Sequence, residues 1–430
     1  MTANTIGTIL LIGGFLGLML LRVPIAFALG LSSLATAWYL GIPTLLVAQR
    51  MVNGLNSFTF LAVPFFILAG QLMTEGGISE RLVRFADAVV GRVRGGLAQV
   101  NVFASMLFGG ISGSSVADVA SIGSFLIPAM TKRGYGPGYS VAVTVTSSVQ
   151  GVLIPPSQNM IYYALAAGGL SVGNLFLAGY VPGVLFGVSL MALCWVMAIR
   201  HRHPEGQRYT LRQAVAVALD ASIGLFTVVI IIGGIAAGIF TATESAAVAV
   251  VYALLVTGLV YRTMTWGKAL KVMRGSLETL ATVIAIIMTS SAFGFLLSYL
   301  KVPAMLSAGI LGLSTDPVMV LLLINVLLLV LGMVMDMGVL ILLMTPILLP
   351  IARSVGVDPI HFGVIMMVGL GIGLVPPPVG TSLIVGCSIA KLPIEKALKD
   401  LWPFYAVMVA VLMLVTYVPA LSLTLPNLLR

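Results

Sequence analysis

The chain has 430 residues, of which 60% are hydrophobic and only 8% are charged. Together with a mean hydropathy of +1.14, this composition lies outside the range of water-soluble globular proteins. Apolar runs of about 20 residues recur along the whole sequence, which predicts an all-α polytopic membrane protein. The net charge of +9 then reports mainly on orientation in the bilayer, so we expect no nucleic acid partner.

The first half of the chain is predicted to combine ordinary membrane helices with three unusual elements. The amphipathic segment from Ile78 to Arg94 is expected to lie in the membrane interface, with Glu80 and Arg84 spaced for an ion pair. Two short apolar arms joined by a Gly- and Ser-rich tip predict a re-entrant hairpin over 96–131. The remaining expected elements are helices over 5–21, 24–41, 58–74 and 172–199, and a broken helix over 138–168.

Paired prolines interrupt an apolar segment in each half of the chain. Pro155-Pro156 lies inside the first broken helix, and Pro376-Pro377-Pro378 lies inside a second, predicted over 360–392. Adjacent prolines remove backbone donors and cannot continue a regular helix. Within a membrane, such breaks occur only where protein or a water-filled cavity satisfies the freed backbone groups, and they point to the binding site of a transporter.

These interruptions belong to a longer internal duplication. Four landmarks recur at a spacing of 222 residues, namely the paired prolines, Pro128 with Pro350, Gly110 with Gly332, and Gly134 with Gly356. At the same spacing Ser114 lies opposite Asp336, which predicts a second hairpin over about 317–352. We therefore expect two repeats, 1–200 and 218–430.

The repeats are predicted to be inverted with respect to each other, because each has an odd number of crossings. A hydrophilic linker, 201–217, joins them. One side of the resulting topology receives only four of the 22 basic residues, and the other side receives the remaining 18, including those of the linker. The positive-inside rule then makes the linker cytoplasmic and both termini periplasmic. The four basic residues on the side predicted to be periplasmic are Arg50, Lys301, Arg353 and Arg430.

Several motifs follow one another along the chain: FGGISGSSVAD at 108–118, IPAM at 127–130, LIPPS at 153–157, TPILLP at 345–350 and PPVG at 377–380. In this order they resemble the large membrane subunit of TRAP (tripartite ATP-independent periplasmic) transporters, over essentially the whole chain. The resemblance implies an elevator-type secondary transporter of the bacterial inner membrane, not an enzyme, that imports a small organic anion bearing a carboxylate. It also implies a small four-helix membrane subunit and a soluble periplasmic substrate-binding protein as partners. Na⁺ is the implied coupling ion, and no other cofactor is expected.

The hairpins and breaks are the predicted binding sites. Na⁺ prefers oxygen ligands, and the carbonyls before the prolines have lost their intrahelical partners. The N-termini of the half-helices after the prolines are expected to face the substrate carboxylate. The expected cation-binding residues are Ser112, Ser114, Ser115, Val152, Leu153, Asp336, Leu374, Val375 and Thr381. The expected substrate-binding residues are Ser157, Gln158, Asn159, Gly380 and Ser382.

Two other functions fit part of the sequence. A self-sufficient Na⁺/anion symporter of related hairpin architecture would share the breaks, and only the family resemblance argues against it. The run from Gly110 to Gly113 also matches the G-x-S-G motif of an intramembrane serine protease. Such a serine needs a base within hydrogen-bond reach. His201 and His203 are expected in the linker and His361 near the outer surface, all three in contact with solvent. No histidine is therefore expected within reach of Ser112, which argues against the protease.

Overall fold

The computed structural model describes residues 3–206 and 209–429, and the regular secondary structure of these ranges is helical. Their one β-type pairing is an isolated bridge between Arg94 and Glu205. Eight helices in the described ranges are long and apolar enough to cross a membrane, which confirms the prediction of an all-α polytopic membrane protein. The eight are Ala3–Leu20, Phe58–Glu75, Val172–Arg200, Leu211–Ala236, Ala242–Val260, Trp266–Tyr299, Met337–Ser354 and Ile394–Tyr417.

The first half of the chain ends with the long helix α12 and contains the first hairpin and the first break. The hairpin consists of α7 and α8, and the break separates α10 from α11. The elements are α1 (Ala3–Thr8), the π-helix η1 (Ile9–Gly13), α2 (Gly14–Leu20), α3 (Ile25–Tyr39), α4 (Thr44–Asn53), the 3₁₀-helix η2 (Phe58–Leu61), α5 (Ala62–Glu75), α6 (Ile78–Val90), α7 (Gly96–Ser112), α8 (Ser115–Lys132), α9 (Pro137–Ser147), α10 (Gln150–Leu153), α11 (Gln158–Ala166) and α12 (Val172–Arg200).

The second half contains the second hairpin, α17 with α18, and the second break, between α19 and α20. The elements are α13 (Leu211–Ala236), α14 (Ala242–Leu255), the π-helix η3 (Val256–Val260), α15 (Trp266–Tyr299), α16 (Val302–Leu313), α17 (Pro317–Gly332), α18 (Met337–Ser354), α19 (Pro359–Gly373), α20 (Thr381–Ala390), α21 (Ile394–Tyr417) and α22 (Ala420–Leu428).

Two elements differ from the sequence prediction. The helix α4, which follows Pro43, has no counterpart among the predicted helices. The linker is shorter than the predicted 201–217, because α13 already begins at Leu211. Thr210 and Gln213 start this helix with a capping box, in which each side chain bonds the other residue's backbone N–H, at 3.4 Å and 3.0 Å.

The amphipathic segment forms α6, and its predicted ion pair is confirmed. Arg84 Nη2 lies 2.6 Å from Glu80 Oε1 on the exposed face of the helix. The opposite face buries Ile78 and Leu82. Arg81 lies between these faces and reaches across to the second half of the chain, where its Nε donates to Asp220 Oδ1 at 3.1 Å.

The expectation that all three histidines contact solvent is wrong for His361, which is 2% exposed. Its Nδ1 lies 3.0 Å from Ser422 Oγ, and its Nε2 lies 3.2 Å from the carbonyl oxygen of Thr416. Both partners come from the C-terminal helices α21 and α22, more than 50 residues further along the chain, so the sequence around His361 gives no sign of them. This imidazole can be buried without leaving an unpaired polar atom, because both ring nitrogens have hydrogen-bond partners.

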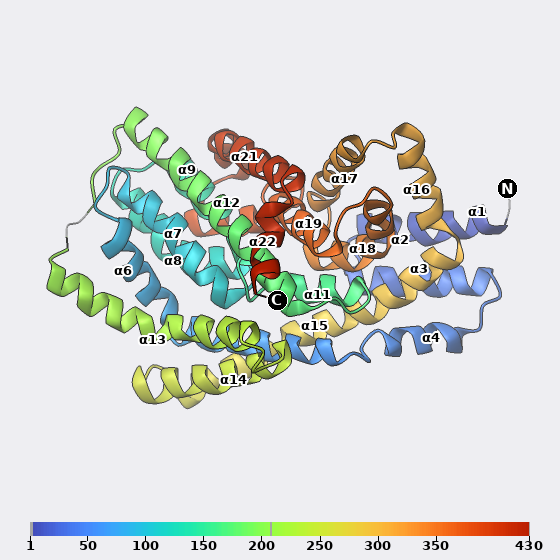
Figure 1. Ribbon diagram of the computed structural model, residues 1–430, viewed down its shortest axis with the longest axis horizontal. Coiled ribbons are helices and arrows are strands. Elements are labelled where there is room, and N and C mark those ends of the chain that lie inside the picture. Colours follow the sequence, from blue (N-terminus) through green and yellow to red (C-terminus); the bar gives the residue numbers. More distant parts are fainter. Residues whose placement is uncertain (1–2, 207–208, 430) are drawn as a thin grey trace.

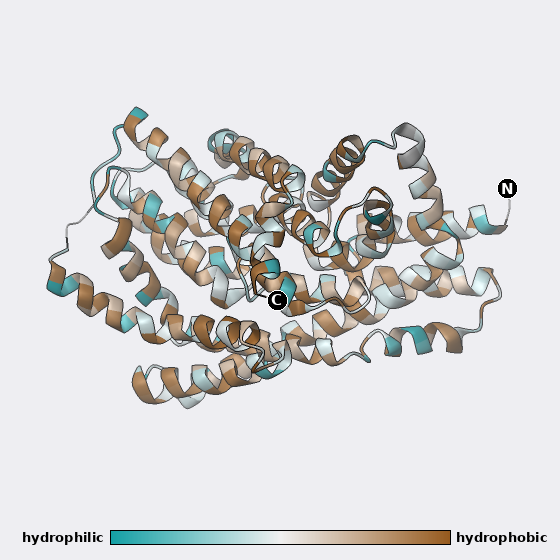
Figure 2. Cartoon of the chain, viewed as in Figure 1, coloured by the Kyte–Doolittle hydropathy of each residue, from teal (hydrophilic) through white to brown (hydrophobic). Residues whose placement is uncertain are grey.

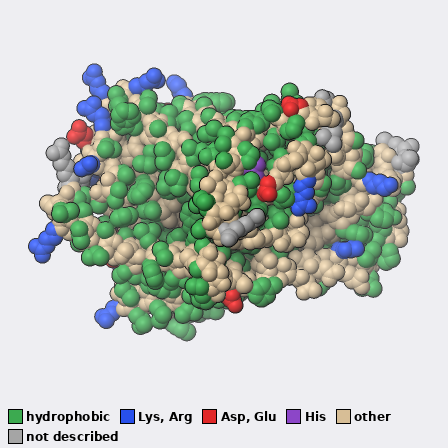
Figure 3. Space-filling model, in the orientation of Figure 1, with side chains coloured by type: hydrophobic (Ala, Val, Ile, Leu, Met, Phe, Trp, Pro, Cys, Tyr) green, Lys and Arg blue, Asp and Glu red, His purple; other side chains and the backbone are tan. Residues whose placement is uncertain are grey.

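The helices form two layers (Figure 1). Along one long side of the molecule run α3, α4, α13, α14 and α15, with α3, α4 and α5 packed against α15. The hairpins and the broken helices lie beside this layer, where α8 packs against α9 and α20, and α17 packs against α19. Hydrophobic residues dominate most helices (Figure 2). On the face shown in Figure 3, Lys and Arg lie mainly toward the two ends of the molecule.

Glycines bring each hairpin into backbone contact with the break of its own half. A Cβ atom added to Gly109 would lie 3.0 Å from the Cα of Gly151, and one added to Gly373 would lie 2.5 Å from the Cα of Gly332. Such separations leave no room for a side chain. Gly151 and Gly373 are themselves 222 residues apart. The same kind of contact therefore holds the hairpin tip against the break in both halves.

Candidate functional site

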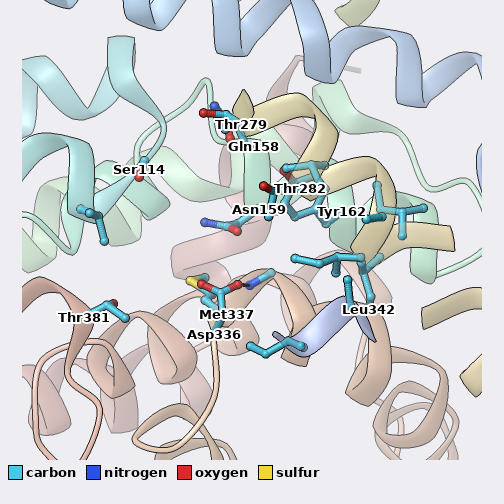
Figure 4. Close-up of a pocket in the computed structure, with 18 of the residues that line it drawn as sticks. Ser114, Gln158, Asn159, Tyr162, Thr279, Thr282, Asp336, Met337, Leu342 and Thr381 are labelled. Carbon is cyan, nitrogen blue, oxygen red and sulfur yellow. Dashed lines mark hydrogen bonds between the residues drawn. The ribbon is translucent and has the colours of Figure 1, made fainter. Parts of the chain in front are cut away.

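A cavity of about 770 Å³ lies where the hairpin tips, the breaks and the helices α3 and α15 meet. Its polar lining consists of hydroxyls, two amides and one carboxylate (Figure 4). Among the described residues that line it, there is no Lys, Arg or His. The labelled polar residues are Ser114, Gln158, Asn159, Tyr162, Thr279, Thr282, Asp336 and Thr381.

Five helices begin at this cavity and contribute residues of their first turn to its wall. The first N–H groups of a helix have no intrahelical partner and carry a partial positive charge, so each N-terminus favours a nearby anion. Several N-termini at one cavity form an anion-attracting environment without a basic side chain. The helices are α3, α8, α11, α18 and α20.

Asp336 provides the carboxylate of the cavity. It is the N-cap residue of α18, and its Oδ1 accepts a hydrogen bond from the backbone N–H of Gly338 at 2.9 Å. The side chain is exposed to the cavity, where it faces Asn159 (Figure 4). No ion pair within residues 3–206 and 209–429 involves it. An acidic group at membrane depth without a basic partner is a functional candidate, because its charge is costly unless a cation compensates it.

The three predicted serines of the first hairpin tip have different environments. Ser114 caps α8, its Oγ accepting from Ala117 N at 3.4 Å, and it lines the cavity. Ser115 also lines the cavity but is only 1% exposed. Ser112 ends α7 and lines a neighbouring cavity instead. The hairpin tip thus directs Ser114 toward the central cavity.

The predicted backbone ligands separate into those that reach the cavity and those that do not. Val152 and Leu374 line it, whereas Leu153 and Val375 are buried away from it. The carbonyl oxygen of Leu374 already accepts a hydrogen bond from Ser382 N at 3.2 Å. Thr381 lines the cavity in the first turn of α20, and its Oγ1 is a buried oxygen with no hydrogen-bond partner. Such an orphan is a good candidate for a cation ligand, because buried polar atoms are normally paired.

Of the residues predicted to bind substrate, Gln158 and Asn159 line the cavity and the other three do not. Ser157 is the N-cap residue of α11 and is fully buried, and its Oγ makes no capping bond and has no hydrogen-bond partner. Gly380 adopts a left-handed conformation, with φ of +47°, at the start of α20. The Oγ of Ser382 lies 2.8 Å from that of Ser115, which in turn lies 2.7 Å from that of Ser148. Ser382 therefore links the second break to the first hairpin rather than facing the cavity.

Sequence reasoning missed Tyr162, Thr279 and Thr282, which all line the cavity. Tyr162 follows Gln158 and Asn159 on the same face of α11, at the i+4 and i+3 positions. Thr279 and Thr282 lie one turn apart on α15, where its polar N-terminal part gives way to an apolar run that begins at Val283. Their helical spacing was the available signal, but nothing local shows that α15 faces the hairpins.

A second cavity, of about 810 Å³, adjoins the first. Both are lined by Ser114, Val116, Gln158 and Thr279. The second cavity extends between α5, α8 and α15 to a charged mouth, where Lys271 Nζ lies 2.8 Å from Glu75 Oε1 and Arg274 Nε lies 2.9 Å from Glu278 Oε1. The central cavity thus adjoins a second cavity that is lined by Lys271 and Arg274.

Comparisons with known proteins identify the family of this chain. The family model described as "Tripartite ATP-independent periplasmic transporter, DctM component" matches residues 12–421. The C4-dicarboxylate TRAP transporter large permease protein DctM of Rhodobacter capsulatus is 38% identical, over 98% of this chain and 99% of its own. The isethionate TRAP transporter permease protein DctMQ of Oleidesulfovibrio alaskensis is 41% identical, over 96% of this chain and 65% of its own. These relatives are transporter permeases, not enzymes.

One solved structure shares the fold. The YdaH transporter of Alcanivorax borkumensis, whose topology is described as unusual, superimposes with a TM-score of 0.62 over 85% of this chain and 86% of its own. The sequences are 13% identical. At this identity the likeness concerns the arrangement of helices and says nothing of substrate.

Proposed function

The chain belongs to the DctM family of tripartite ATP-independent periplasmic transporters, as a large permease subunit of secondary transport, and from this premise we propose that it imports a small organic anion, coupled to Na⁺ and dependent on a periplasmic binding protein. The observation that carries the anion is the set of five helix N-termini at a cavity that no basic side chain of the described residues lines. Helix dipoles, amides and hydroxyls, together with the coupling cations proposed below, would then compensate a substrate carboxylate. The names of these two relatives refer to C4-dicarboxylates and to isethionate, which are both small anions.

The proposed coupling cations bind where each hairpin tip meets a break. In the first half, Ser114 and the backbone of Val152 supply oxygens beside the cavity. In the second half, Asp336 and the unpaired Thr381 Oγ1 do so. Hard cations prefer such oxygen ligands, and carboxylate, hydroxyl and carbonyl groups together satisfy them. A cation next to the substrate carboxylate would strengthen its binding, which is the physical basis of the proposed coupling.

The two halves are proposed to be inverted repeats of an elevator-type transporter. Each half presses a hairpin against a break through glycines, so the hairpins and breaks are expected to move as one unit. The layer of α3, α4, α13, α14 and α15 would be the static part. The second cavity supports this proposal because it adjoins the site and is lined by Lys271 and Arg274, which the positive-inside prediction expects on the cytoplasmic side.

Orientation can be tested with single cysteines. Both native cysteines, Cys194 and Cys387, are buried. In Asn4→Cys and Glu205→Cys variants, each at an exposed position, an impermeant thiol reagent applied to intact cells is expected to label the first and not the second. Opening the cells should make Glu205→Cys reactive. Labelling of Glu205→Cys alone in intact cells would refute the periplasmic N-terminus and the inverted repeats with it.

Dependence on partners is the decisive test of the tripartite function. The isethionate relative is named DctMQ, which joins the letters of two subunits, and this protein matches 65% of its length. We therefore expect the small membrane subunit to be a separate chain here. Proteoliposomes holding only this subunit, with a Na⁺ gradient and a C4-dicarboxylate or isethionate outside, are expected to show no uptake above protein-free vesicles. Adding the small subunit and the binding protein should restore it. Robust uptake by the large subunit alone would instead establish the self-sufficient symporter.

A further inference from the structure

A second group of buried oxygens lies away from both cavities, inside the packing of α7, α8 and α9. It comprises the side chains of Asn101, Ser105, Asp118 and Ser147, none more than 1% exposed. None of the four lines either cavity. The group therefore has no part in the binding of a solute in the central cavity.

Asp118 is the charged member of this group, and it lacks a basic partner. Its Oδ1 is 3.3 Å from Ser105 Oγ, and its Oδ2 is buried with no hydrogen-bond partner. No ion pair in the described part of the chain involves it. An ionised carboxylate at such depth is strongly disfavoured unless a positive charge lies beside it. The position in the first turn of α8 compensates only part of a full charge.

The oxygens of this group are farther apart than those of the hydroxyl pair of Ser115 and Ser148. Ser105 Oγ lies 3.2 Å from Ser147 Oγ, which lies 3.3 Å from Asn101 Oδ1. With the contact between Ser105 and Asp118 this makes three consecutive oxygen–oxygen separations of 3.2–3.3 Å. By contrast, Ser115 lies 2.7 Å from Ser148, within the usual O–H···O range.

Such separations suit ligands of one cation. Hard cations of calcium's size have oxygen ligands at about 2.3–2.6 Å, so ligands at right angles lie roughly 3.3–3.7 Å apart. Two further contacts orient the group: Asn101 Nδ2 donates to Thr144 Oγ1 at 2.7 Å, and Ser147 Oγ donates to Thr144 O at 3.0 Å. The first directs Asn101 Oδ1 away from Thr144, and the second leaves the lone pairs of Ser147 Oγ for a metal.

We propose that Asp118, with Ser105, Ser147 and Asn101, binds one monovalent hard cation, Na⁺, at a site separate from the hairpin tips. A single carboxylate and three neutral oxygens are neutralised by one positive charge, whereas a divalent ion would leave a buried excess charge. The site joins both arms of the first hairpin to α9. Its occupancy therefore stabilises the hairpin against the helix that leads into the first break.

The experiment is a Na⁺ titration of thermal unfolding on the full chain with its small membrane subunit, at constant ionic strength set with choline chloride. A Ser114→Ala/Asp336→Asn double variant serves as the background, because it weakens the proposed coupling sites. We expect this background to keep a Na⁺-dependent rise in melting temperature, since a bound ligand stabilises the folded state. Adding Asp118→Asn should shift the Na⁺ midpoint at least tenfold or remove the rise. K⁺ should give a weaker rise than Na⁺.

Two milder variants keep the test decisive if Asp118→Asn does not fold. Ser105→Ala and Ser147→Ala each remove one proposed ligand and should shift the Na⁺ midpoint several-fold. Thr146→Val is the matched control, because it removes a buried hydroxyl of α9 that makes an ordinary 2.7 Å bond to Ala142 O; it should leave the midpoint unchanged. The proposal is overturned if the background shows no Na⁺-dependent rise, or if the ligand variants titrate like Thr146→Val. Either result would leave the coupling sites untouched, because those are assayed by uptake.

Discussion

In a Na⁺ titration of uptake by the reconstituted complex, the Asp336→Asn variant is expected to need roughly five- to a hundredfold more Na⁺ than the wild type for half-maximal transport. The change keeps the size of the side chain but removes the charge of the carboxylate that lines the cavity. Loss of one charged ligand oxygen is taken to cost about 1–3 kcal/mol, which corresponds to this range of concentrations. Ser114→Ala should act in the same direction through the first half.

The matched control is Asp316→Asn, which alters the N-cap carboxylate of another hairpin helix, α17. Asp316 is exposed and does not line the cavity. The Na⁺ dependence of uptake by the Asp316→Asn variant should therefore equal that of the wild type. Substrate affinity must be measured alongside. If Asp336→Asn and Ser114→Ala keep the wild-type Na⁺ dependence while substrate affinity collapses, both residues bind the solute, and the cation sites lie elsewhere.

The hairpins and breaks could be located from the sequence because their causes are local. Prolines at 155, 156 and 376–378 cannot continue a helix, and the Gly- and Ser-rich tip ends α7 at Ser112. Helix-capping residues such as Ser114 and Asp336 mark the next helix start in the same short stretch. These features need no knowledge of the rest of the chain, which is why eight of the predicted site residues do line the cavity. They are Ser114, Ser115, Val152, Gln158, Asn159, Asp336, Leu374 and Thr381.

The structure departs from the sequence-based expectations at contacts between segments far apart in the sequence. Ser382 is buried against Ser115, 267 residues earlier in the chain, and local sequence predicts only that it starts a half-helix. Thr279 and Thr282 belong to α15, which joins the cavity by packing and not by any motif. His361 is buried by α21 and α22. The sequence therefore indicates which residues start and end helices, but the long-range packing decides which of them share a cavity.

Gly373→Ala is expected to have a large structural effect at the contact between the second hairpin and the second break. The new Cβ would lie 2.5 Å from the Cα and 2.6 Å from the carbonyl carbon of Gly332, both backbone atoms of the second hairpin. Backbone cannot rotate away as a side chain can, so α19 and α17 must separate. Overpacking of this kind costs about 1–3 kcal/mol. We expect a lower melting temperature and, because Leu374 follows directly and lines the cavity, a loss of uptake.

Two further alanines make the comparison quantitative. Gly369→Ala makes the same substitution one turn earlier in α19, where the Cβ would meet Leu328 Cβ at an ordinary 3.5 Å, so melting temperature and uptake should stay near wild type. Gly332→Ala adds a methyl group to the same interface from the side of the hairpin, with its Cβ 3.0 Å from the Cα of Gly373. Its melting temperature and uptake should lie between those of the other two variants. This order follows from the distances alone. If Gly373→Ala melts and transports like Gly369→Ala, the hairpin and the break are not held in backbone contact, and the proposal that they move as one unit loses its structural basis.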